Sequence, residues 1–213
     1  VSSGTELLSG LYVHGGTGSD NLYLMDGVPL YSVGHLAGVF SSFNSDVIEN
    51  VDFYKSGFPA RYGGRMSSVV DVTTRDGDFN DYSGTFSIGL IEGRFQMEGP
   101  IVKGKTSFNF GLRRSWLDVL TIPGFAIYNA LRDSENSDHT VMRYAMTDLN
   151  GKITHKFSDD NTLSFSVFAG QDALKSKSVS DPTDWNTAGN ESNMELGLRW
   201  GNILASLRWK YNI

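Results

Sequence analysis

The chain has 213 residues, a formal net charge of −6 and no cysteine. The lack of cysteine excludes a disulfide framework and a cysteine-based zinc site, and the negative charge without any basic run argues against a nucleic-acid partner. With 24 glycines, 12% aromatic residues and only 5 prolines, the composition favours many short strands and tight turns. No stretch approaches the roughly 18 consecutive apolar residues of a membrane helix. Strands of a transmembrane barrel alternate apolar and polar residues and escape that test.

Short apolar runs separated by glycine turns make up residues 1–78. These runs predict the strands of a small mixed sheet, at residues 11–13, 21–25, 48–55 and 68–74. Asn44 precedes a predicted capped helical turn that leads into Val47. Asp26 and Gly27 predict a tight turn in which the aspartate bonds its own backbone, and a ligand or metal role for Asp26 is the alternative.

From Tyr82 onward the pattern changes to strict alternation of apolar with polar or small residues. The alternating stretches predict antiparallel strands, at residues 86–90, 108–112, 145–157, 194–200 and 203–211. The last two stretches predict a hairpin across a two-residue turn, Gly201-Asn202.

The predicted connections alternate in length. Short turns fall at residues 103–104, 158–161 and 201–202, and long connections that are polar or irregular fall at 116–141 and 171–192. Short turns on one side and long loops on the other are typical of an outer-membrane barrel, with the short turns in the periplasm. A soluble β-sandwich, which also alternates, is the alternative. Asp159-Asp160-Asn161 lacks the spaced ligands of a calcium loop and is predicted to be a turn.

Alternation also assigns the two faces of the predicted barrel strands. Odd-numbered residues between Ala145 and Phe157 are expected to face lipid, whereas Asp148, Asn150 and Lys152 are expected to face the lumen. The further residues expected on the lipid side are Leu163, Phe165, Val167, Leu196, Leu198, Ile203, Leu207 and Trp209.

Several segments of the first half carry a family resemblance. They are Asn-Leu-Tyr-Leu-Met-Asp-Gly-Val-Pro at 21–29, Phe-Asn at 43–44 before the strand at 48–55, and Gly-Phe-Pro-Ala-Arg-Tyr-Gly-Gly-Arg-Met-Ser-Ser-Val-Val-Asp-Val at 57–72. In that order they resemble the plug domain of TonB-dependent outer-membrane receptors, and residues 99–101 and 111–116 resemble the first barrel strands of that family. The implied fold is mainly β: an N-terminally incomplete, small mixed α/β plug domain at 1–78, then antiparallel strands of a truncated transmembrane β-barrel at 79–213.

The chain departs from the family in three ways. His14 stands where such receptors usually have arginine, the energy-coupling segment near the mature N-terminus is absent, and the barrel is short. A plugged transporter barrel has about 22 strands, whereas residues after Tyr82 supply roughly seven at about ten residues each. A chain truncated at both ends is therefore expected.

The resemblance implies that Arg61 and Arg65 pair with barrel-wall carboxylates and hold the plug in the lumen. Arginine suits this task because its planar fork stays charged and binds carboxylates through two hydrogen bonds. The alternative is an ordinary solvated pair in a turn, worth at most about 1 kcal/mol. The glycine-interrupted segment that contains Tyr31, His35 and Phe40 is a candidate plug loop facing ligand.

The function that the resemblance implies is active uptake of a small nutrient, such as a siderophore, cobalamin, an oligosaccharide or a peptide. The TonB energy-transducing complex and outer-membrane lipid are the implied partners, and the plug would face the periplasm. A receptor that signals without transport, on the same fold, is the first alternative, and a soluble β-rich binding module is the second. Neither a cofactor nor a metal site is expected. The sequence contains no Gly-x-Ser-x-Gly, His-Glu-x-x-His or phosphate-loop motif, so an enzyme is not expected.

Overall fold

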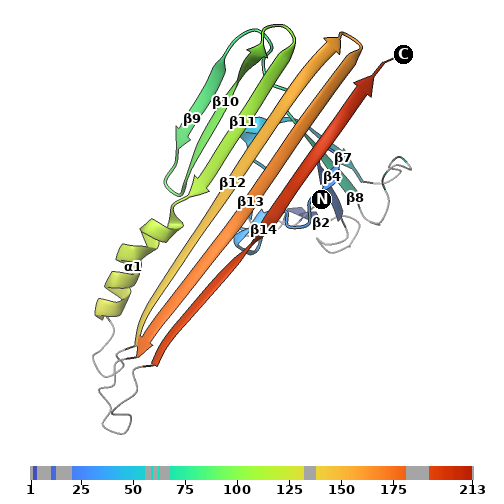
Figure 1. The fold of residues 1–213 in the computed structure, drawn as a ribbon. Helices are drawn as coiled ribbons and strands as arrows, with labels where there is room; N and C mark the ends of the chain where they lie inside the picture. The colour runs from blue at the N-terminus through green and yellow to red at the C-terminus, as the bar shows by residue number, and fades with distance from the viewer. Residues whose placement is uncertain are drawn as a thin grey trace, which may run out of the picture.

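The computed structural model describes residues 2–3, 11–12, 21–55, 59, 62, 68–131, 138–180 and 192–212. Within these residues, a six-stranded sheet, called here the long sheet, has the strand order β14-β13-β12-β11-β10-β9. A four-stranded sheet, called here the small sheet, has the order β4-β3-β8-β7. Figure 1 shows the small sheet against one face of the long sheet, which we call the inner face; the opposite face is the outer face.

The small sheet is mixed, as predicted. Its strands are β3 (Asn21–Met25), β4 (Val28–Pro29), β7 (Ile48–Tyr54) and β8 (Ser68–Thr74). β3 pairs in parallel with β8, whereas the other two pairings are antiparallel. Two short ladders pair β1 (Ser2–Ser3) with β2 (Leu11–Tyr12), and β5 (Gly34–His35) with β6 (Phe40–Ser41). The strand predictions at residues 21–25, 48–55 and 68–74 are therefore confirmed to within one residue at their ends. The strand predicted at residues 11–13 forms at Leu11–Tyr12 but pairs with β1 and is not part of the small sheet, and residue 13 lies outside the described residues.

Two of the predicted turns form, one of them with different hydrogen bonds. Asp26 and Gly27 have φ values of 48° and 81°, the positive angles required by a type I′ hairpin turn between β3 and β4. The carboxylate of Asp26, however, accepts bonds from Thr74 on β8 and not from its own turn. Asn44 caps the 3₁₀-helix η3 (Ser45–Val47) by accepting a hydrogen bond from the backbone N–H of Asp46. A second 3₁₀-helix, η2 (Leu36–Gly38), follows β5.

The long sheet is antiparallel throughout. Its strands are β9 (Ser83–Ile88), β10 (Glu92–Val102), β11 (Thr106–Ser115), β12 (Asp138–Ser158), β13 (Asn161–Ser180) and β14 (Ser192–Tyr211). The predicted short turns after β10 and β12 lie at the same end of the sheet, while β12 begins, β13 ends and β14 begins at the other end (Figure 1). After Tyr82 the described residues form six strands, all in this sheet, and not the seven or so expected.

The predicted turn at Gly201-Asn202 is wrong, and so is the first part of the predicted loop at residues 171–192, because residues 171–180 belong to β13; residues 181–191 lie outside the described residues. β13 continues to Ser180, and β14 passes through Gly201 without a break, paired with β13 along its whole length. The misleading signal was a change of parity, because apolar residues occupy even positions up to Trp200 and odd positions from Ile203. A hairpin turn produces such a change. A single continuous strand produces it too, if its apolar side chains move from one face of the sheet to the other.

The connection at residues 116–141 is also more regular than predicted. It contains the helix α1 (Leu117–Leu131), which includes Pro123 and has no buried residue. Among the described residues, no helix is long and apolar enough to span a membrane.

The outer face of the long sheet is apolar over half of its length and charged over the rest. Because directly paired residues share a face, the register connects Leu149, Ala169 and Ile203 in one row across β12, β13 and β14. The next rows, nearer the short turns, lie on the same three strands. Their apolar outward residues are Ile153, Phe165, Leu163, Val167, Ala205, Leu207 and Trp209. Beyond Gln171, towards the long connections, most of the outward residues are instead charged or small, with Val141 as an apolar exception.

The inner face has the reverse pattern. Where the small sheet covers it, the inward side chains are mostly polar. Beyond the small sheet, β14 presents Met194, Leu196, Leu198 and Trp200 on the inner face, and all four are exposed. The expectation that Leu196 and Leu198 lie on the same face as Leu207 is therefore wrong, because the strand continues without the hairpin that would have turned them outward.

Candidate functional site: a polar interface between the two sheets

The interface between the small sheet and the long sheet is mostly polar. Its apolar part is one small cluster, in which Met25 and Leu30 of the N-terminal half pack with Phe168 and the partly buried Leu204 of the long sheet. Around this cluster, charged and amide side chains from β11, β12 and β13 are buried against the small sheet and its loops. Two ion clusters, one around His35 and one around Lys152, connect the two parts.

His35 lies between two carboxylates of the long sheet. Its Nδ1 is 2.9 Å from an oxygen of Asp172 in a hydrogen bond, and its Nε2 is 2.9 Å from Oδ1 of Asp148 as an ion pair without hydrogen-bond alignment. Arg113 donates from Nε and Nη2 to the other oxygen of Asp148, at 2.9 and 2.5 Å. The hydroxyl of Tyr144 donates to Asp172. We call these five residues the His35 cluster.

The charges of the His35 cluster balance when the histidine is protonated. His35 is only 3% exposed, and burial alone would lower its pKa, but the contacts of its ring with the carboxylates of Asp148 and Asp172 outweigh burial and raise the pKa from 6.5 to about 9. Protonated His35 and Arg113 then face two carboxylates. Such a pairing is needed because an unpaired buried charge costs several kcal/mol.

The cluster also reaches the backbone of the segment around His35. Asp172 accepts a bond from the N–H of Leu36 at 3.3 Å, and Arg113 donates to the carbonyl oxygen of Ser41 at 2.5 Å. The loop from β5 to β6 is thereby fixed to β11 and β13 at both of its ends.

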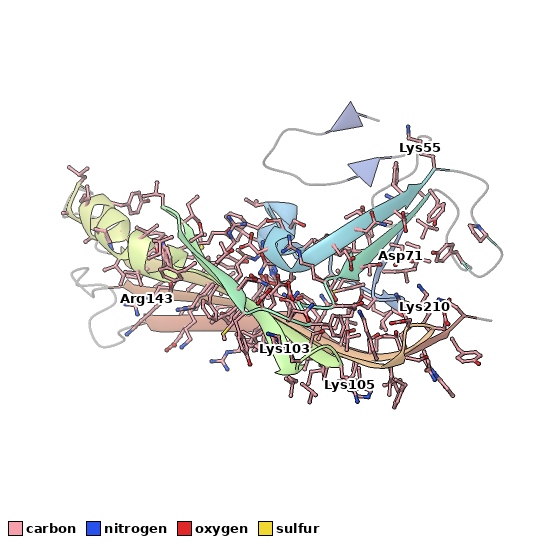
Figure 2. All side chains as sticks on the ribbon, turned by 90° about the horizontal axis from the view of Figure 1, so that it is seen from above. Lys55, Asp71, Lys103, Lys105, Arg143 and Lys210 are labelled. Carbon is pink, nitrogen blue, oxygen red and sulfur yellow. The ribbon has the colours of Figure 1, made fainter. Side chains whose placement is uncertain are left out.

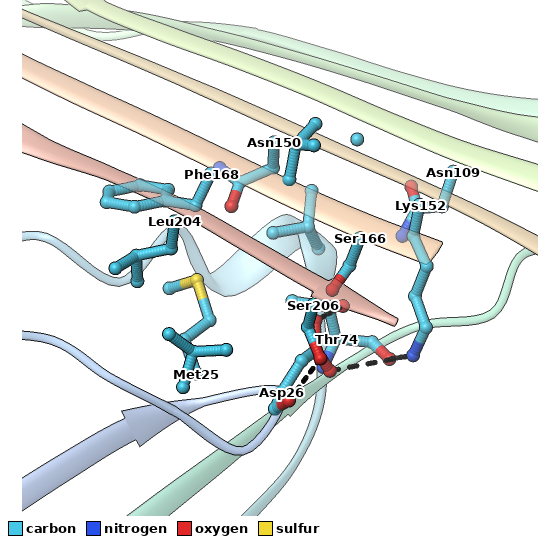
Figure 3. A pocket seen from close by; sticks show the side chains of 14 residues that line it. Met25, Asp26, Thr74, Asn109, Asn150, Lys152, Ser166, Phe168, Leu204 and Ser206 are labelled. Carbon is cyan, nitrogen blue, oxygen red and sulfur yellow. Dashed lines mark hydrogen bonds and ion pairs between the residues drawn. The ribbon is translucent and has the colours of Figure 1, made fainter. Parts of the chain in front are cut away.

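Lys152 forms the second connection, on the short-turn side of the first. Its Nζ is 2.8 Å from Asp76, 3.6 Å from Asp26 and 2.7 Å from the carbonyl oxygen of Thr74. Asp26 is held in turn by the N–H and hydroxyl of Thr74, at 3.1 and 2.6 Å. Figure 3 shows Lys152 reaching from the long sheet toward Asp26 and Thr74. The Lys152 side chain is 6% exposed, so the ion pairs replace most of the hydration of its ammonium group.

Neutral hydrogen bonds extend the interface along β14 and β11. The amide of Asn202 bonds both backbone groups of Ser32, at 2.8 and 3.2 Å. Ser206 donates to the carbonyl oxygen of Asp26 at 2.8 Å, and Ser107 donates to that of Asp76 at 2.6 Å. Most of these contacts are of a kind that water can replace, unlike tightly packed apolar side chains.

A small pocket lies within the interface. Figure 3 shows the residues that line it, among them Met25, Asn150, Ser166 and Leu204. The side-chain amide of Asn150 has no hydrogen-bond partner among the described residues, and a buried amide in such a place is ordinarily satisfied by water.

The structure places the residues predicted for the site as follows. Asp148, Asn150 and Lys152 are 0%, 4% and 6% exposed and face the small sheet. In the segment that was predicted to face ligand, Tyr31 is 82% exposed, His35 is buried against the long sheet, and Phe40 is partly buried in β6. These three residues do not form one surface.

The predicted plug arginines, Arg61 and Arg65, lie outside the described residues, as does His14. Among the described residues, the cations that join the long sheet to the N-terminal half are His35, Arg94, Arg113 and Lys152; Arg94 of β10 pairs with Asp46 of η3 at 3.4 Å. Sequence reasoning missed Asp172 because it fell in a predicted loop, and Arg113 because it was used only for family resemblance.

The described residues contain no group of three histidine, aspartate or glutamate side chains that could hold a metal ion. The arrangement defines a small domain docked through exchangeable polar contacts on the inner face of an antiparallel barrel-like sheet.

Comparison with known proteins identifies the docked domain. Residues 1–70 match the family model described as TonB-dependent Receptor Plug Domain. The match confirms the predicted resemblance: the N-terminal third of the chain is similar to the plug domain of TonB-dependent receptors.

Two solved structures are similar over most of the chain. The siderophore receptor PirA from Acinetobacter baumannii is 13% identical, with a TM-score of 0.49 over 91% of this chain and 37% of that one. The outer membrane transporter YddB from Escherichia coli is 14% identical, with a TM-score of 0.46 over 93% of this chain and 34% of that one. The chain thus spans about a third of the length of these structures. No curated protein sequence matches the chain significantly.

Proposed function

We propose that the chain is part of an outer-membrane transporter that takes up a small nutrient in a TonB-dependent manner, with residues 1–78 as a plug that gates the lumen and residues 79–213 as barrel wall. The plug model at residues 1–70 supports the class. The observation that carries the gating role is the interface itself, because a plug that must move needs contacts that water can replace.

Arg61 and Arg65 remain part of this proposal as further cations that hold the plug. The proposed orientation puts the short turns in the periplasm and the long connections outside the cell. Tyr31 and the apolar inner surface of β14 would then line the path above the plug, where a siderophore, cobalamin, an oligosaccharide or a peptide would bind.

A strain that lacks the gene for the full-length protein tests the proposal. The strain is grown with each candidate nutrient, a ferric siderophore, cobalamin, an oligosaccharide or a peptide, as the limiting source, with and without functional TonB. We expect one nutrient whose use requires both the protein and TonB. A receptor that signals without transport is the second candidate: it would alter gene expression in response to the nutrient but leave its uptake unchanged.

A further inference from the structure

The outer face of the long sheet carries four exposed cations just beyond its apolar rows. Arg143 of β12 lies directly opposite Lys175 of β13, and Lys177 is the next outward residue along β13. Arg199 of β14 lies opposite the neighbouring outward position, Ala173. We call Arg143, Lys175, Lys177 and Arg199 the basic cluster. Figure 2 shows Arg143 near α1, far from the lysines at the short-turn end of the sheet.

The cations of the basic cluster have no ion pair or side-chain hydrogen bond within the part of the chain that the structure describes. Like charges directly opposite each other weaken an antiparallel pair, so Arg143 and Lys175 would be stabilised by an external anion. Glu195 lies opposite Lys177, and its single negative charge does not balance the four positive charges of the basic cluster. A shallow hollow of about 260 Å³ lies among them and is lined by Val141, Arg143, Lys175, Ser176, Lys177 and Glu195.

The position of the basic cluster along the strands indicates which anion. On β14 the apolar outward residues run from Tyr211 to Ile203, a length of about 27 Å at roughly 3.4 Å per residue. When tilted, this length approaches the apolar band of an outer-membrane barrel, about 25 Å tall. Arg199 follows Ile203 by four residues, or roughly 14 Å of strand. With strand tilt, this height corresponds to the lipid headgroups that border the hydrocarbon core.

We propose that the basic cluster binds the phosphate groups of outer-leaflet lipids at the extracellular boundary of the membrane. Arginine binds a phosphate through two parallel hydrogen bonds, while each lysine acts as a mobile point charge. The proposal rests on the outer-membrane location and orientation proposed above, but not on transport. The surface is distinct from the plug interface, since its side chains point to the opposite face of the sheet.

Binding to a defined lipid that carries phosphate groups tests the proposal. The full-length protein in neutral detergent is titrated with bisphosphorylated lipid A, and bound lipid is counted by native mass spectrometry. The test variant carries Arg143→Gln, Lys175→Gln and Lys177→Gln. Three cations near an anionic surface contribute about 1 kcal/mol each, so the affinity should fall about 100-fold. A charge-conserving variant, Lys175→Arg with Lys177→Arg, should bind like the parent and shows that the position folds normally.

The matched control removes three exposed cations at the short-turn end, with Lys103→Gln, Lys105→Gln and Lys210→Gln. It should bind lipid A like the parent protein. Equal weakening in both triple variants would overturn the proposal, because the effect would then follow net charge and not position. Displacement of lipid A by millimolar inorganic phosphate would also overturn it, since the site would then bind free anions. A loss of uptake in a variant that still binds lipid A would bear on the proposed function alone.

Discussion

Replacement of His35 by alanine should weaken docking of the plug in a manner that depends on pH. The substitution removes the cation that faces both Asp148 and Asp172, each at 2.9 Å. Breaking a buried pair by removal of one partner costs about 3 to 5 kcal/mol. The raised pKa gives a consistent figure, since a change from 6.5 to about 9 corresponds to about 3 kcal/mol of interaction that only the charged ring makes.

The sign of the pH dependence follows from the direction of the pKa change. Because the pKa of His35 is higher in the docked plug than in a free one, its stabilisation is complete below pH 6.5 and disappears as the pH rises through about 9. His35→Ala should therefore destabilise docking by about 3 kcal/mol at pH 6 and by far less at pH 10.

Docking can be measured by the distance between two spin labels during urea titration of the full-length protein. Labels at Tyr31→Cys and Lys105→Cys occupy exposed positions on the two parts, and the chain has no native cysteine. The urea midpoint for plug release gives the docking free energy of the parent and of His35→Ala at each pH. A double-mutant cycle with Asp172→Asn isolates the pairwise contribution. An equal effect of His35→Ala at pH 6 and pH 10, or no effect at either, would refute the charged-histidine account.

Three further predictions concern the other cluster, the two faces of the sheet and the hairpin turn. Lys152→Met should lower the docking free energy by about 3 kcal/mol in the same assay, because the buried carboxylate of Asp26 keeps its hydrogen bonds from Thr74 but loses its cation. An unchanged urea midpoint would show that the ion pair contributes nothing. Leu207→Arg should lower the stability of the barrel in lipid vesicles by about 2 to 4 kcal/mol. Leu198→Arg should lower it much less, because Leu198 points to the inner face. A larger loss for Leu198→Arg than for Leu207→Arg would refute the register. Gly27→Ala should lower plug stability by about 1 kcal/mol, measured by thermal unfolding, because φ is +81° at this position; an unchanged melting temperature would mean that the turn has another conformation.

The sequence predicted those parts of the fold that depend on short-range patterns. The strands of the small sheet follow from runs of β-branched residues between glycine turns, and the hairpin at Asp26-Gly27 follows from residues that tolerate positive φ. The facing of β12 follows from the alternation around Asp148, Asn150 and Lys152, which the structure buries as a set.

The sequence did not predict contacts that depend on distant segments. His35 and Asp172 are separated by 137 positions, so no local pattern connects them. The failure at Gly201 has a different cause. Where β14 passes out of the apolar part of the outer face, its apolar side chains switch from odd to even positions and so to the inner face. A hairpin turn would produce the same switch in the sequence. The helix α1 was not predicted because it contains Pro123 and Gly124, two adjacent residues that ordinarily interrupt a helix.

A reversible tether between plug and wall tests the central claim, that transport requires the plug to leave this interface. Ser32→Cys and Asn202→Cys replace a pair in which the amide of Asn202 bonds both backbone groups of Ser32, so a disulfide can join the plug to β14. In cells that use the nutrient identified by the growth assay, we expect the oxidised double variant to bind the nutrient but not take it up, and reductant to restore uptake. Each single variant should transport normally. Full uptake by the oxidised, cross-linked protein would contradict the account.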